Sequence, residues 1–98
     1  MINVQVRRGS GEIIRRGDCR LDWLTTIQEI DEGEFPFLAG LLPYADTMFN
    51  SRQASWLRRE VSDPLVRQIV GRESAAEIEE LCQQVESGSH LYLWFVGD

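Results

Sequence analysis

Three polar residues have side chains that could act together in catalysis: Asp46, Asn50 and His90. A catalytic arrangement would pair the chain's only histidine with Asp46, Asp98 or a serine. The chain contains no GxSxG elbow and no ordered Ser/His/Asp signature. We therefore expect His90 to be an ordinary residue at the start of a strand and the chain not to be an enzyme. A small enzyme using these three residues is the less favoured alternative.

Metal and cofactor chemistry is also not indicated. Cys19 and Cys82 are far apart and belong to no CxxC pair, so zinc is not expected, and two reduced, structural thiols are favoured over a disulfide. The turn at 9–11 lacks the strand–helix context and the lysine of a phosphate-binding loop. Four oxygen-bearing residues match no EF-hand or two-metal spacing: Asp46, Asn50, Glu60 and Asp98.

The charge of the chain is negative and unevenly distributed. The net charge is −6, but residues 1–20 hold five arginines against Glu12 and Asp18, whereas residues 21–98 hold five arginines against fourteen acids. An acidic domain repels phosphate backbones, so nucleic-acid binding is disfavoured. Such a domain suits a basic protein partner, but the favoured explanation of the charge is that it keeps a small protein soluble. No apolar run is long enough to cross a membrane or to form a signal peptide, so we expect a cytoplasmic protein without membrane contact.

The elements that must position these residues begin with a hairpin. Alternating apolar residues predict a strand over 2–6, a turn at 9–11 and a short return strand over 12–16. A three-residue apolar spacing predicts an amphipathic helix from Cys19 to Asp31. A broken apolar segment follows, with a helical turn at 37–42 and a brief strand at 47–49.

The second half of the chain has clearer helix signals. Asn50 and Gln53 predict a reciprocally capped helix over 51–62, and Asp63 followed by Pro64 predicts a second helix over 65–70. Ser74 and Glu77 fit a capping box for a third helix that ends near 86.

The last nine residues predict the centre of the fold. Leu91 to Val96 is an unbroken run of large apolar side chains, which a strand buried on both faces would accommodate, and Trp94 is expected in the core. We therefore predict one α+β domain over 1–98. Its small sheet has three to four strands with the C-terminal strand central, packed by three to four helices on one or both faces.

Two surfaces are candidates for protein binding. One is the acidic stretch that closes the helix predicted from Cys19 to Asp31, formed by Glu29, Asp31, Glu32 and Glu34. Because the stretch continues beyond that helix, we call it the acidic loop. The other is a helix face formed by Arg52, Trp56 and Arg59, because exposed tryptophan and arginine are favoured interface anchors. The open alternative for the second surface is that Arg59 only stacks over a half-buried Trp56 ring.

Two segments carry a family resemblance. Residues 43–50, PYADTMFN, fit the pattern P-Y-x-D-T-x-F-N, and residues 90–98, HLYLWFVGD, fit H-L-Y-L-W-F-x-G-D. In these segments the chain resembles small uncharacterised bacterial proteins, and the resemblance implies no known activity.

The function expected from these observations is that of a small acidic protein-binding module. Immunity proteins that neutralise bacterial toxins are an analogy of size and charge. The alternative is a self-associating structural or regulatory subunit, a homodimer joined by an apolar patch of Phe35, Phe37, Leu41 and Leu42.

Overall fold

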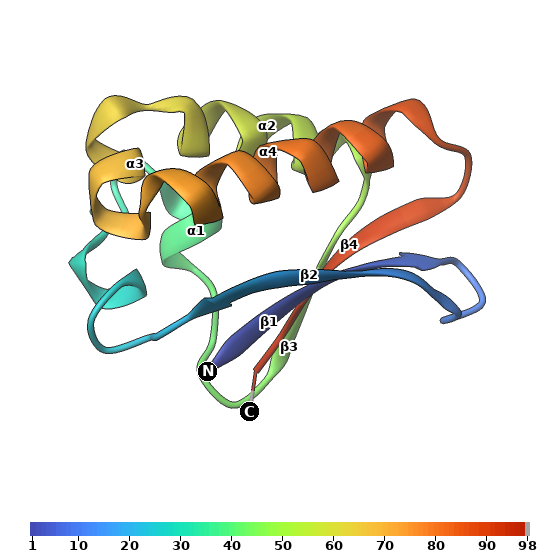
Figure 1. The fold of residues 1–98 in the computed structure, drawn as a ribbon, viewed down its shortest axis with the longest axis horizontal. Helices are drawn as coiled ribbons and strands as arrows, with labels where there is room; N and C mark the ends of the chain where they lie inside the picture. Colours follow the sequence, from blue (N-terminus) through green and yellow to red (C-terminus); the bar gives the residue numbers. More distant parts are fainter. Residues whose placement is uncertain (98) are drawn as a thin grey trace.

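The computed structural model of the protein describes residues 1–97, so Asp98, the last residue of the second resemblance segment, lies outside the described residues. The fold is α+β with a four-stranded antiparallel sheet in the order β2-β1-β4-β3 (Figure 1). The strands are β1 (Ile2–Arg8), β2 (Ile13–Leu21), β3 (Asp46–Phe49) and β4 (Leu91–Val96). The C-terminal strand is central, as predicted, and it pairs with the N-terminal strand.

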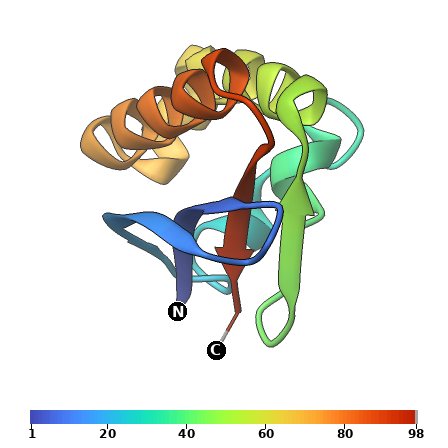
Figure 2. The same cartoon turned by 90° about the vertical axis from the view of Figure 1, so that its right-hand side faces the viewer.

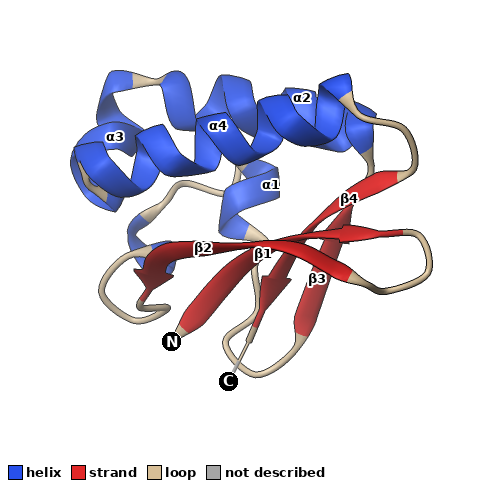
Figure 3. Ribbon diagram, turned by 45° about the vertical axis from the view of Figure 1, so that its right-hand side comes forward, coloured by secondary structure: helices blue, strands red, loops and turns tan. Residues whose placement is uncertain are grey.

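The helices cover one face of this sheet and leave the other face open (Figures 2 and 3). The helical elements are a 3-10 turn η1 (Ile27–Glu29) and the helices α1 (Pro36–Ala39), α2 (Ser51–Ser62), α3 (Pro64–Val70) and α4 (Arg72–Ser87). Helices α2 and α4 pack against each other above the strands, and α1 lies below this layer, toward the sheet. No helix among residues 1–97 is long and apolar enough to span a membrane.

The central strand β4 divides its side chains between two different environments. Leu93 and Phe95 are fully buried against the helices, whereas Tyr92, Trp94 and Val96 lie on the open side and are only partly buried. The expectation that both faces of this strand are covered is therefore wrong, and Trp94 is not a core residue. Its ring is covered by the guanidinium of Arg7 from β1, 4.3 Å from the ring centroid.

The largest difference from the sequence-based prediction lies between residues 17 and 31. The return strand does not end at Gly17 but continues to Leu21, and the helix predicted from Cys19 to Asp31 is absent apart from η1. The side chain of Asp22 accepts hydrogen bonds from the main-chain N–H groups of Leu24 and Thr25, which forms a turn directly after β2.

The later helices begin largely as their local signals indicate. Asn50 and Gln53 form the complete capping box of α2, and Asp63 caps α3 by accepting a hydrogen bond from the Leu65 N–H. Helix α4, however, begins at Arg72 rather than at a capping box of Ser74 and Glu77.

Glu77 instead joins α4 to the edge strand of the sheet. Its carboxylate accepts hydrogen bonds from the main-chain N–H groups of Asp18, at 2.9 Å, and Cys19, at 2.7 Å. These groups lie where the pairing of β1 with β2 shifts register, so the strand itself offers them no regular partner. Burial by itself would raise the pKa of Glu77, but the two N–H groups, together with the Cys19 thiol and the charge of Arg15, outweigh burial and the pKa is lowered.

We predict that replacing Glu77 weakens the fold and reduces its acid sensitivity. Because the folded-state pKa of Glu77 lies below the ordinary 4.5, its contribution is complete above pH 4.5 and is lost as pH falls further. Glu77→Gln should lower the free energy of unfolding by roughly 1–2 kcal/mol at neutral pH. Urea unfolding across the acid range measures both effects.

Glu80→Gln is the matched control on the same helix. Glu80 pairs with Arg15 at 3.3 Å and its side chain is 64% exposed, so the cost should stay below about 0.5 kcal/mol. Equal losses in the two variants would contradict the role assigned to Glu77.

Candidate functional site

The segment between β2 and β3 carries the acidic loop and three largely exposed apolar side chains, Leu24, Leu42 and Tyr44. Helix α1 lies within this segment and fixes its position. The carboxylate of Glu60, on α2, accepts hydrogen bonds from the main-chain N–H groups of Phe37, at 3.0 Å, and Leu38, at 2.8 Å. Glu60 is only 8% exposed, and burial raises its pKa, although the two N–H groups partly offset that effect. This buried carboxylate thus accepts hydrogen bonds from main-chain N–H groups in the first turn of α1, which have no acceptor within the helix.

A second hydrogen bond fixes the chain beyond α1. The indole N–H of Trp23 donates to the main-chain oxygen of Leu41 at 3.0 Å. This bond ties the turn after β2 to the loop that precedes β3. The same loop packs closely against the end of β4, because a Cβ on Gly97 would lie 2.6 Å from the main-chain N and O of Ala45.

These contacts bring side chains from three segments together around an apolar groove at one end of the sheet. The groove has a volume of about 370 Å³ and is lined by Met1, Ile2, Asp22, Trp23, Leu24, Pro43 and Tyr44. Three of its large side chains are mostly exposed: Met1 at 58%, Leu24 at 67% and Tyr44 at 84%. Exposed apolar side chains gathered in one place are typical of an interaction surface.

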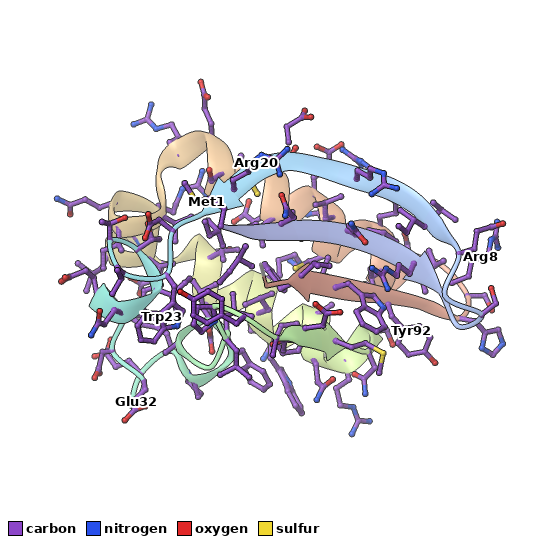
Figure 4. The ribbon with its side chains drawn as sticks, turned by 90° about the horizontal axis from the view of Figure 1, so that it is seen from below. Met1, Arg8, Arg20, Trp23, Glu32 and Tyr92 are labelled. Carbon is purple, nitrogen blue, oxygen red and sulfur yellow. The ribbon has the colours of Figure 1, made fainter. Side chains whose placement is uncertain are left out.

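The acidic loop lies beside this apolar groove. All four of its carboxylates are exposed, and none forms an ion pair within residues 1–97. A second hollow, of about 520 Å³, is lined by Glu29, Asp31 and Glu32, and Trp23 lines both hollows. Figure 4 shows Met1 and Trp23 at the same end of the sheet, with Glu32 beyond Trp23. The two features therefore form one continuous surface, which is apolar on one side of Trp23 and acidic on the other.

The helix face predicted as the second contact region is exposed as expected. Arg52 and Arg59 are exposed on α2, and Trp56 is 39% exposed. The Trp56 ring packs against Phe37, at 5.4 Å between ring centroids, and not under Arg59. Helix α1 borders both predicted regions, because Phe37 touches Trp56 and Ala39 lines the acidic hollow.

The apolar patch expected to join a homodimer does not exist as predicted. Phe35 is 7% exposed and Leu41 is 1% exposed, so both belong to the core, and Phe37 is partly buried between Trp56 and Phe49. Of that patch only Leu42 is largely exposed.

The three residues considered for catalysis are only partly brought together. Asn50 and His90 line one small hollow of about 170 Å³. Asp46 lies opposite Val96, at the far end of the strand pair from Asn50, and does not line that hollow. The side chain of Asn50 is already used to cap α2.

The two thiols are not activated nucleophiles. Burial, with a hydrogen bond to Glu77, raises the pKa of Cys19 to about 12, and burial with the charge of Glu86 raises the pKa of Cys82 to about 12. Neither forms a disulfide, and no cluster of three metal-ligating side chains occurs among residues 1–97.

Comparisons with known proteins add no further constraint. No family model, no curated protein and no solved structure matches this chain.

The apolar groove was not found by sequence reasoning. Its residues come from three separate segments, each of which reads as an ordinary strand end or loop. The one signal in the sequence was the occurrence of aromatic and aliphatic residues beside turn formers, at Trp23-Leu24 and Pro43-Tyr44.

We predict that Glu60 controls the rigidity of the segment that carries the site. Glu60→Met leaves the N–H groups of Phe37 and Leu38 without an acceptor and should lower the free energy of unfolding by roughly 2–4 kcal/mol. Amide hydrogen exchange at Phe37 and Leu38 should accelerate. Glu60→Gln, which keeps one carbonyl acceptor, should have an intermediate effect.

Glu73→Met, an exposed position on α4, is the control and should leave both quantities close to those of the unmodified protein. Unchanged exchange at Phe37 and Leu38 in Glu60→Met would show that α1 does not depend on this carboxylate.

Proposed function

We propose that this protein is a binding module for a basic protein, which it contacts through the apolar groove and the acidic loop. The observation that carries the proposal is the continuity of the two features across Trp23. Protein interfaces typically combine an apolar centre, which supplies most of the binding energy, with charged residues that guide association.

The exposed side chains of the groove suit the apolar part of such an interface. Tyr44 and Leu24 are far more exposed than the core residues next to them, so a partner would remove a large apolar area from water. The main-chain segments beneath them are held by the Trp23 bond to Leu41 and by Glu60, so little backbone ordering would be required on binding.

The charges of the acidic loop support a basic partner. Four exposed carboxylates that form no ion pair with the described residues produce a negative field that accelerates encounter with a positively charged surface. Inhibition of a basic protein, as immunity proteins do with the toxins that they neutralise, is the role that we propose for this surface.

We predict that the two parts of this surface act on different rate constants. The protein is used as bait at low and high salt, and the retained partner is purified for kinetic measurement. Replacing the four carboxylates with amides (Glu29→Gln, Asp31→Asn, Glu32→Gln, Glu34→Gln) should slow association about tenfold at low salt and weaken its salt dependence. Leu24→Ala with Tyr44→Ala should instead accelerate dissociation, by about tenfold or more.

Two matched controls test the location of the surface. Leu65→Ala removes an apolar side chain that is 52% exposed on α3, and Glu73→Gln with Glu80→Gln removes two exposed charges on α4. Neither should change the kinetics by more than about twofold. Equal effects in the controls, or a partner whose binding is indifferent to both site variants, would overturn the proposal.

A further inference from the structure

The face of the sheet opposite the helices has an unusual composition for a surface that no element covers. By register, Asn3, Gln5 and Arg7 of β1 lie beside Val96, Trp94 and Tyr92 of β4. The neighbouring strands add Arg16 and Arg20 on one side and Met48 on the other. We call these nine residues the open face. Figure 4 views the molecule from this side, with no helix in front of the strands.

The arginines of the open face differ from those elsewhere on the same two strands. Arg8 pairs with Glu12, and Arg15 pairs with Glu80 on the helix side of the sheet. Arg7, Arg16 and Arg20 form no ion pair with any residue among 1–97, although the chain has more carboxylates than guanidinium groups. Guanidinium groups without an ion pair among residues 1–97 thus gather on the β1 and β2 side of this face, whereas the carboxylate of Asp46 lies on its β3 side.

One of these guanidinium groups is already held in position. Arg7 stacks over the Trp94 ring at 4.3 Å, and its Nε donates to the side-chain oxygen of Gln5 at 2.9 Å. The terminal nitrogens of Arg7 remain available for the planar, two-point contact that a guanidinium makes with a carboxylate. Part of the entropy cost of ordering a long side chain is therefore already met before a ligand arrives.

The apolar groups on the same face give it a second kind of contact. Trp94 lies between Gln5 of β1 and Met48 of β3, and Met48 is 49% exposed. Across the sheet the surface thus changes from basic at β2, through amides on β1, to aromatic and aliphatic at β4 and β3. A matching ligand has carboxylates along one side and apolar groups along the other.

We propose that the open face binds an acidic, amphipathic polypeptide segment of another protein. This surface differs in place and in sign of charge from the apolar groove and the acidic loop. It would allow the protein to contact a second, acidic polypeptide without using the site proposed above.

The observations favour a polypeptide over a single-stranded nucleic acid. Arg7 already stacks over the Trp94 ring, so a base that stacked on that side of the ring would have to displace the guanidinium. Asp46 lies on the same face opposite Val96 and would repel a continuous phosphate backbone.

The test uses fluorescence anisotropy with a short labelled peptide in which Glu and Leu alternate. We expect saturable binding that weakens with salt, and much weaker binding of the same peptide with Gln in place of Glu. Arg16→Ala with Arg20→Ala should reduce the affinity by about threefold to tenfold. Amide chemical-shift changes on titration should map to β1, β2 and β4.

The matched control is Arg52→Ala with Arg59→Ala. It removes two exposed arginines, also without ion pairs within residues 1–97, from α2 and changes the net charge equally. This control should leave the affinity within about twofold. The same loss in both double variants would show that the peptide responds to net charge alone and would overturn the proposal.

Three further results would also overturn it. The first is the absence of saturable binding. The second is tighter binding of a single-stranded oligonucleotide than of the acidic peptide, abolished by Arg16→Ala with Arg20→Ala, which would assign the face to nucleic acid. The third is a concentration-dependent dimer that the same double variant dissociates, which would assign the face to a second copy of this chain.

Discussion

The carboxylate of Glu60 lies inside the protein between α1 and α2, and both of its oxygens accept main-chain hydrogen bonds from α1. Burying this charge is unfavourable, which is why its pKa is raised, and the two N–H groups recover only part of the cost. Helix α1 has four residues, too few to be stable alone, so its position depends on this contact and on Leu38 in the core. The loop toward Tyr44 begins at the end of α1. The positions of the groove residues in that loop therefore depend on the position of α1.

The elements that the sequence predicts correctly are those whose signals are local. The Asn50–Gln53 capping box, the Asp63-Pro64 pair and the apolar run at 91–96 each act within a few residues, and α2, α3 and β4 appear where these signals place them. The helix predicted over 19–31 does not form, because the interactions that favour a strand there come from a residue distant in the sequence. Glu77 reaches the N–H groups of Asp18 and Cys19 across 59 and 58 residues, and these bonds favour a longer strand.

The candidate site shows the same division between local and distant determinants. A run of acidic residues is visible in any sequence, so the acidic loop was predicted and is exposed. The apolar groove exists only because β1, the end of β2 and the loop before β3 meet at one end of the sheet. The Glu on the apolar face of α2, at position 60 beside Leu57 and Val61, was visible in the sequence, but its acceptor role depends on residues 22 and 23 positions away.

The net charge of the chain does not describe the charge of its separate surfaces. Within residues 1–97, four of the ten arginines pair with carboxylates, and the acids of the acidic loop and the arginines of the open face form no ion pair there. Neighbouring residues of a strand point to opposite faces of the sheet. Arg15 therefore faces α4, where it pairs with Glu80, whereas Arg16 lies on the open face. The molecule is 33 Å long, several times the screening length of roughly 8 Å at physiological salt. At contact distance a partner therefore responds to the local surface, so an excess of acids over the whole chain does not exclude an acidic partner on the open face.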